Sequence, residues 1–98
     1  MLYTLTDLQD MIMPVIKRYK AEHAILFGSY ARGEATITSD IDLMIIGGTA
    51  FDPTDIFAIA EDLHQLSGKN VDVYEINEID KTSPLYESIV KDGILLGL

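Results

Sequence analysis

The sequence predicts an α/β (α+β) domain in which a small mixed sheet of three or four strands packs against about four helices. Two observations support this fold class. Segments with apolar residues at helical spacing alternate with short apolar runs rich in β-branched residues, and loops rich in glycine or proline separate them. The chain has 98 residues, 48% of them hydrophobic and 23% charged. Residues 1–98 are therefore expected to form one globular domain.

The first helix is expected over residues 6–21. Thr6 and Gln9 have the spacing of a capping box at its start. Pro14 interrupts this segment, and because proline removes a backbone donor, the helix should kink or begin afresh there. The apolar positions recur at helical spacing and are Leu8, Met11, Ile12, Val15, Ile16 and Tyr19.

Two strands are expected next. The apolar run Ala24–Phe27 ends at Gly28 and is typical of a buried strand, and Ser29–Arg32 could form a short helical turn after it. Asp40–Ile46 predicts the second strand, which Gly47 closes.

The same alternation continues to the end of the chain. Asp52 followed by Pro53 predicts the start of a helix that ends at Gly68. The remaining elements are a strand over Val71–Ile76, a helix from Ser83 to about Asp92, and a short edge strand over Ile94–Leu96.

Charge and composition exclude several classes of protein. The net charge is −9, from 16 acidic and 7 basic residues, which argues against direct binding of a long nucleic acid. There is no run of about 18 apolar residues and no basic-then-apolar leader, so we expect a cytoplasmic protein without a membrane partner. Cysteine is absent. Any bound metal must therefore have oxygen or histidine ligands.

Three aspartates lie in or beside predicted strands. Asp40 and Asp42 share one face of their strand because side chains alternate, although such a pair by itself could sit on an exposed surface. The following residues, Leu43–Ile46, are apolar on both faces, which indicates a buried strand. Asp72 stands between two valines in the next strand. If the two strands are neighbours, three carboxylates converge and favour Mg²⁺ or Mn²⁺.

Gly28 and Ser29 follow a predicted buried strand. Free backbone N–H groups and a hydroxyl at such a turn can hold phosphate oxygens. Taken alone, a Gly-Ser pair is usually just a turn.

The stretch GSYARGEATITSDIDLMI, Gly28–Ile45, resembles the signature of the DNA polymerase beta nucleotidyltransferase superfamily, and specifically its minimal, MNT-type group. This resemblance implies the nucleotidyltransferase fold, with Asp40 and Asp42 as catalytic ligands of two Mg²⁺ ions (Mn²⁺ being possible). It also implies that Asp72 is the third metal ligand and accepts the acceptor's proton. Gly28 and Ser29 would bind the triphosphate. The additional nucleotide-binding candidates are Arg32, which could instead pair with Glu34, and Ser39, which could instead cap the local turn.

The resemblance also implies a partner. Minimal nucleotidyltransferases pair with HEPN toxins as antitoxins, and we expect this chain to transfer AMP from ATP to a hydroxyl, a tyrosine in particular, of such a toxin. One alternative is a non-catalytic antitoxin or binding module that neutralises by complex formation alone. Another is a nucleotidyltransferase acting on a small molecule, such as an aminoglycoside-like compound.

Overall fold

The computed structural model of the protein describes residues 1–97. Its first helix, α1, spans Leu5–Arg18, and the residue that caps it is Thr4 and not the predicted Thr6. The Thr4 hydroxyl accepts the Asp7 N–H at 3.0 Å, and the Asp7 carboxylate accepts the Thr4 N–H at 2.9 Å. The capping box predicted for Thr6 and Gln9 was therefore wrong, because an aspartate at the third helical position completes the same reciprocal pair two residues earlier.

Pro14 does not interrupt α1. A kink or a new helix start was predicted at this residue. The new start is wrong, since the helix runs through Pro14, and the kink stays a prediction. Pro14 is exposed, and so is Asp10, whose carbonyl has lost the N–H that would normally bond to it. Water can hydrate that carbonyl. Burial of Ile12, Val15 and Ile16 on the opposite side holds the helix against the core.

The strands form one mixed sheet in the order β3-β2-β1-β4. β1 is antiparallel to both β2 and β4, whereas β2 and β3 are parallel. β2 lies inside the sheet, and its residues Leu43, Met44 and Ile45 are buried. This burial confirms the prediction that the strand is buried on both faces. β4 is the predicted edge strand. The bounds are β1 (His23–Phe27), β2 (Ile41–Ile46), β3 (Val71–Glu75) and β4 (Ile94–Leu95).

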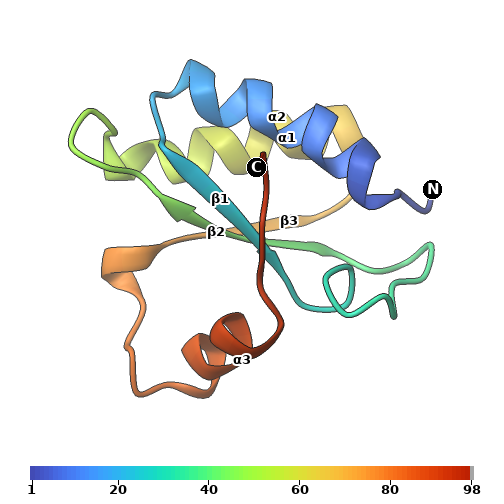
Figure 1. The fold of residues 1–98 in the computed structure, drawn as a ribbon. Coiled ribbons are helices and arrows are strands. Elements are labelled where there is room, and N and C mark those ends of the chain that lie inside the picture. The colour runs from blue at the N-terminus through green and yellow to red at the C-terminus, as the bar shows by residue number, and fades with distance from the viewer. Residues whose placement is uncertain (98) are drawn as a thin grey trace.

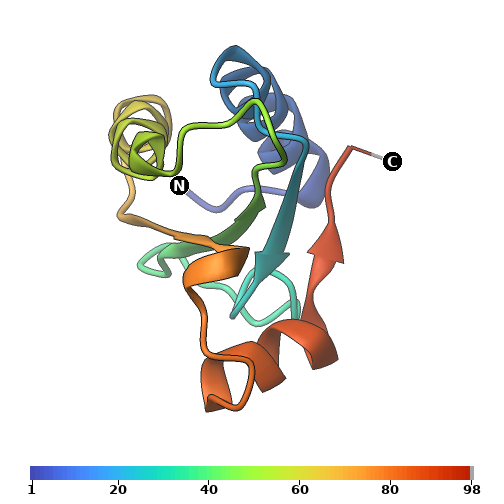
Figure 2. The same cartoon turned by 90° about the vertical axis from the view of Figure 1, so that its left-hand side faces the viewer.

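Helices cover both faces of the sheet (Figures 1 and 2). α1 and α2 (Ile56–Ser67) lie on one face, and α3 (Pro84–Asp92) lies on the other. The larger hydrophobic cluster lies under α1 and α2, while the smaller one, on the α3 side, contains Phe27, Met44, Ile79 and Ile89. The predicted α/β class with a small mixed sheet is thus confirmed.

Residues 1–97 contain three α-helices, one fewer than predicted. The fourth helical segment, the short turn predicted over Ser29–Arg32, is a single turn and not a regular helix. Arg32 N–H donates to the Gly28 carbonyl at 3.1 Å, and Gly33 N–H donates to the Tyr30 carbonyl at 3.4 Å. None of the helices in this part of the chain has the length and apolar character needed to cross a bilayer.

Candidate active site

The parallel pairing of β2 and β3 places two of the predicted aspartates side by side. Asp42 and Asp72 are direct partners across the two strands, so their side chains emerge on the same face. Ile41, Leu43 and Val71, which alternate with them, belong to the core beneath α1 and α2. The two carboxylates therefore lie on the α3 side of the sheet.

Gly28, directly after β1, brings the backbone close to the Asp42 carboxylate. Phe27, the last residue of β1, pairs with Asp42, and the chain then turns at Gly28 with φ +75°. A Cβ atom built on Gly28 would lie 2.3 Å from Asp42 Oδ2. A residue with a side chain would therefore displace the carboxylate, and only glycine lets the backbone approach it so closely.

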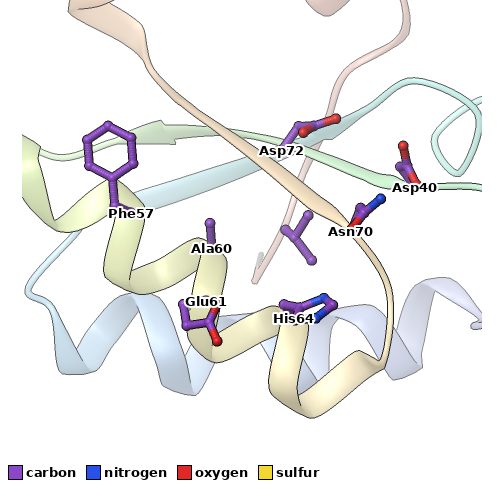
Figure 3. Close-up of a pocket in the computed structure, with 8 residues that line it drawn as sticks. Asp40, Phe57, Ala60, Glu61, His64, Asn70 and Asp72 are labelled. Atoms are coloured by element: carbon purple, nitrogen blue, oxygen red, sulfur yellow. The ribbon is translucent and has the colours of Figure 1, made fainter.

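Asp40 lies just outside β2, one residue before its first residue Ile41. It is exposed, and together with Asp72 it lines a hollow of about 400 Å³ along the outer edge of β3. Figure 3 shows both carboxylates at the beginning of their strands, with α2 below them. The other residues lining this hollow are Phe57, Ala60, Glu61, His64, Asn70 and Val71.

Burial and neighbouring charge raise the pKa of Asp42 from its ordinary value of 3.8 to about 6. Desolvation is the largest cause, followed by the charge of Asp72 and a hydrogen bond with its carboxyl group, then the charge of Asp40. The Arg32 guanidinium acts in the opposite direction. The site thus holds more negative charge than its own residues neutralise.

We expect the metal-free protein to lose stability as the pH rises through about 6. The native state binds the Asp42 proton more tightly than the unfolded chain, so this group stabilises the fold fully below about pH 3.8, and that contribution disappears as Asp42 ionises. Thermal unfolding in EDTA between pH 4 and pH 7 checks this. The difference in melting temperature between the native protein and Asp42→Asn should change sharply across this range, and a constant difference would contradict it.

The donor chemistry of these residues fits a divalent cation. Within residues 1–97, no three histidine, aspartate or glutamate side chains are gathered closely enough to form a ready-made ion site. Mg²⁺, however, is typically held by one or two carboxylates together with substrate phosphates and water. The adjacent pair Asp42 and Asp72 offers such carboxylates, and a cation would relieve the charge repulsion that, after desolvation, helps to raise the Asp42 pKa. Asp40 lies close enough to contribute to that pKa.

The loop after β1 is a tight, hydrogen-bonded turn, and phosphate binding by Gly28 and Ser29 stays a prediction. Ser29 is half-buried, and its carbonyl accepts the Glu34 N–H at 2.9 Å. In the described chain, the N–H groups of Ser29, Tyr30 and Ala31 donate to no backbone carbonyl. Successive free N–H groups of this kind are able to bind an anion.

Arg32 and Ser39 both make local contacts. Arg32 Nε lies 3.0 Å from Glu34 Oε2, and its Nη1 lies 4.0 Å from an Asp92 carboxylate oxygen at the end of α3. The Ser39 hydroxyl accepts the Thr36 N–H at 2.8 Å, which is the local turn contact considered for it. Nucleotide binding by these two residues stays a prediction.

Two residues near the aspartates were missed in the sequence. Tyr74 follows Asp72 by two positions and so shares its face; its ring lies 6.0 Å from that of Phe27. Burial, and then the charges of Asp72 and Asp42, raise the Tyr74 pKa. The alternation along β3 could have identified it. Lys69, which contacts the loop before Asp40, carried no local signal.

Residues 10–97 match the protein family described as polymerase beta, nucleotidyltransferase. Among curated proteins, the chain is 32% identical over 91 residues to a candidate protein adenylyltransferase of Methanocaldococcus jannaschii. This similarity covers 93% of this chain and 90% of the relative. A second candidate protein adenylyltransferase of the same organism is 32% identical over 95 residues, covering 93% and 96% of the two chains.

Solved structures with a similar fold include several toxin–antitoxin complexes. A chain of a toxin–antitoxin crystal structure with AMP-PNP has a TM-score of 0.78 at 23% identity, covering 91% of this chain and 72% of that one. A chain of the complex between a tri-AMPylated HEPN toxin of Shewanella oneidensis and its MNT antitoxin has a TM-score of 0.73 at 20% identity, covering 96% and 72%. A candidate minimal nucleotidyltransferase has a TM-score of 0.75 at 26% identity, covering 94% and 95%.

Proposed function

Because the chain belongs to the polymerase beta nucleotidyltransferase family, we propose that it transfers AMP from ATP to a hydroxyl group of a partner protein. The observation that supports this most strongly is the register of β2 and β3, which sets Asp42 beside Asp72 while Gly28 closes on Asp42. The aspartates and the turn at Gly28 thus lie at the same end of strands β1, β2 and β3, which supports the proposal.

The residues divide the chemistry between them. Asp40, Asp42 and Asp72 would hold Mg²⁺, and the bound ion would neutralise the triphosphate and polarise the phosphorus that is attacked. The free N–H groups after Gly28 would orient the β- and γ-phosphates. Asp72 would accept the proton of the attacking hydroxyl, and its exposure on β3 beside the hollow supports this role.

The reaction is a displacement at the α-phosphorus. A bond forms between the acceptor oxygen and the α-phosphorus, the bond from that phosphorus to the bridging oxygen breaks, and pyrophosphate leaves with the electron pair. The acceptor's proton goes to Asp72. Catalysis then depends mainly on the positions of the three aspartates and the turn at Gly28.

We infer that the acceptor is a tyrosine of a HEPN toxin and that the chain is its antitoxin. Two findings support this: the structural similarity to chains of toxin–antitoxin complexes, in one of which the HEPN toxin is tri-AMPylated, and the open hollow beside Asp72. The exposed Phe57, 75% accessible at the edge of that hollow, offers an apolar contact for a partner.

The experiment incubates the native protein, or Asp42→Asn, with a cognate HEPN toxin, ATP and Mg²⁺, and measures AMP on the toxin by mass spectrometry. We expect AMP on a tyrosine with the native protein and none with the variant. Full neutralisation of the toxin by Asp42→Asn would instead support the binding-module alternative. Transfer to an aminoglycoside in the absence of toxin would support the small-molecule alternative.

We expect Arg32→Gln to weaken ATP binding about tenfold, because the variant loses the positive charge that would contact the triphosphate. The ion pairs of Arg32 with Glu34 and Asp92 lie at the surface and are weak, so they leave the guanidinium available for a phosphate. Calorimetric titration with ATP and Mg²⁺ measures this change. Glu34→Gln is the matched control because it removes the same ion pair but leaves the guanidinium. If both variants bind ATP like the native protein, Arg32 has no role in nucleotide binding.

A further inference from the structure

Lys69 is a buried lysine that connects the end of α2 with the loop before β2. Only 8% of the residue is exposed. Its ammonium donates to the Ile37 carbonyl at 2.8 Å and to the Ser39 carbonyl at 3.1 Å, and it lies 5.7 Å from the centre of the Tyr30 ring. No carboxylate of residues 1–97 lies within 4.0 Å of it. Two carbonyl dipoles and an aromatic face therefore stabilise the charge in place of a counter-ion.

A buried ammonium is costly for the fold. It loses strong hydration, which is why lysine is among the residues least often found fully buried. A methionine at this position would fill similar space without that loss of hydration. The arrangement therefore favours a role that needs the donors of the ammonium group, namely holding the two carbonyls of the loop.

Those contacts fix the backbone on both sides of Asp40. The carbonyl of Ser39, which immediately precedes it, is held by Lys69. The N–H of Ile41, which follows it, donates at 3.0 Å to the carbonyl of Asn70, the residue next to Lys69. The segment Lys69–Asn70 thus secures both neighbours of Asp40, although Asp40 itself lies outside β2 and is exposed.

Lys69 is itself anchored to α2. Its N–H donates to the Ser67 hydroxyl at 3.1 Å, and its carbonyl lies 2.7 Å from His64 Nδ1. Gly68, with φ +72°, ends the helix and directs the chain toward β3. Hydrogen bonds therefore connect the last turn of α2, through Lys69, to the loop that carries Asp40.

We propose that Lys69 is a positioning residue for the Asp40 carboxylate, and through that carboxylate for the divalent cation that accompanies ATP. The first part of this inference concerns the loop alone; the second rests on the proposed function. Without Lys69, the carbonyls of Ile37 and Ser39 lose their donor, and Asp40 loses its fixed position beside Asp42. A higher Mg²⁺ concentration is then needed to fill the site.

The test compares Lys69→Met with the native protein in two measurements. The first is hydrogen exchange of the Ser39 and Ile41 amides without metal. The second is calorimetric binding of α,β-methylene-ATP, which cannot transfer AMP, at increasing Mg²⁺. We expect both amides to exchange at least tenfold faster and the Mg²⁺ concentration for half-maximal binding to rise about tenfold or more, with saturated binding near the native value. Lys81→Met, which changes an exposed lysine, is the matched control and should alter neither measurement.

Conservative variants separate positioning from general damage to the fold. Lys69→Arg keeps the charge and the donors, and it should restore at least part of the Mg²⁺ dependence. If Lys69→Met fails to fold, Lys69→Gln serves in its place, because the amide retains one donor while the charge is removed. Unchanged hydrogen exchange of the Ser39 and Ile41 amides in a folded variant would overturn the first part of the inference, that Lys69 holds the loop before β2.

Native exchange combined with native Mg²⁺ dependence would overturn the whole inference. Faster exchange with unchanged Mg²⁺ dependence would overturn its second part. Absence of Mg²⁺-dependent binding in the native protein would refute the proposed function and the second part of the inference, while hydrogen exchange would still decide the first.

Discussion

Replacing Asp42 by asparagine is expected to lower the rate of AMP transfer by about 10³-fold or more. Asp42 is the aspartate nearest the centre of the site, flanked by Asp72 on β3 and by Gly28 after β1. An amide retains the size of the side chain but not its charge, so the cation loses a ligand at the point where charge develops. A factor of 10³ corresponds to about 4 kcal/mol of transition-state stabilisation. Single-turnover transfer from labelled ATP at saturating toxin measures it.

The same substitution should stabilise the metal-free fold at pH 7. Burial and the charge of Asp72 make the ionised Asp42 unfavourable in the native state, and asparagine removes that charge. Asp42→Asn should therefore melt at a higher temperature than the native protein in EDTA while being nearly inactive. Asp10→Asn, an identical change on the exposed side of α1, is the control and should alter neither property greatly. An active Asp42→Asn protein would contradict the assignment of Asp42 as a metal ligand.

Gly28→Ala is expected to lower AMP transfer by about 100-fold or more, the second largest effect. The new methyl group would lie 2.3 Å from Asp42 Oδ2, so the carboxylate must move, and a displacement of about 1 Å at a reacting centre can cost that much in rate. The left-handed backbone at φ +75° should also cost about 1–2 kcal/mol of stability with any side chain present. Chemical denaturation and single-turnover transfer measure the two effects.

Gly33→Ala separates the two causes. Gly33 has nearly the same backbone conformation, φ +72°, but no atom lies within 4 Å of the Cβ that alanine would add. It should show the loss of stability of about 1–2 kcal/mol without the displacement of Asp42. Equal losses of transfer in the two variants would mean that backbone strain, and not the approach to Asp42, explains the Gly28 result.

Local chemistry predicted most of the fold. The β-branched run before Gly47 marked strand β2, and Asp52 followed by Pro53 marked a helix start. The Asp52 carboxylate does accept the Thr54 N–H at 3.0 Å, but the residues that it caps, Pro53–Asp55, form a short 3-10 helix, and α2 begins only at Ile56. The errors at α1 also have local causes. Thr4 with Asp7 competed with Thr6 and Gln9 for the same cap, and the exposed position of Pro14 made its missing donor tolerable.

The candidate site was predictable as far as alternation along a strand extends. That rule placed Asp42 on the face opposite Leu43. Whether Asp72 lies beside Asp42 is decided by the direction and register of β3, and these depend on the crossover through α2. The contacts of Lys69 join residues 30 and 32 positions apart in sequence, so no local pattern announces them. The clash that a side chain at Gly28 would cause is likewise a property of the packed strands.

The most direct test of the central claim is which phosphate of ATP stays on the acceptor. The native protein is incubated with Mg²⁺, a cognate HEPN toxin and ATP labelled at either the α- or the γ-phosphate, and the toxin is then isolated. Attack at the α-phosphorus predicts label on the toxin from α-labelled ATP only, with pyrophosphate released in equal amount and nothing transferred by Asp42→Asn. Label from γ-labelled ATP, or equal labelling with the native protein and Asp42→Asn, would contradict the account.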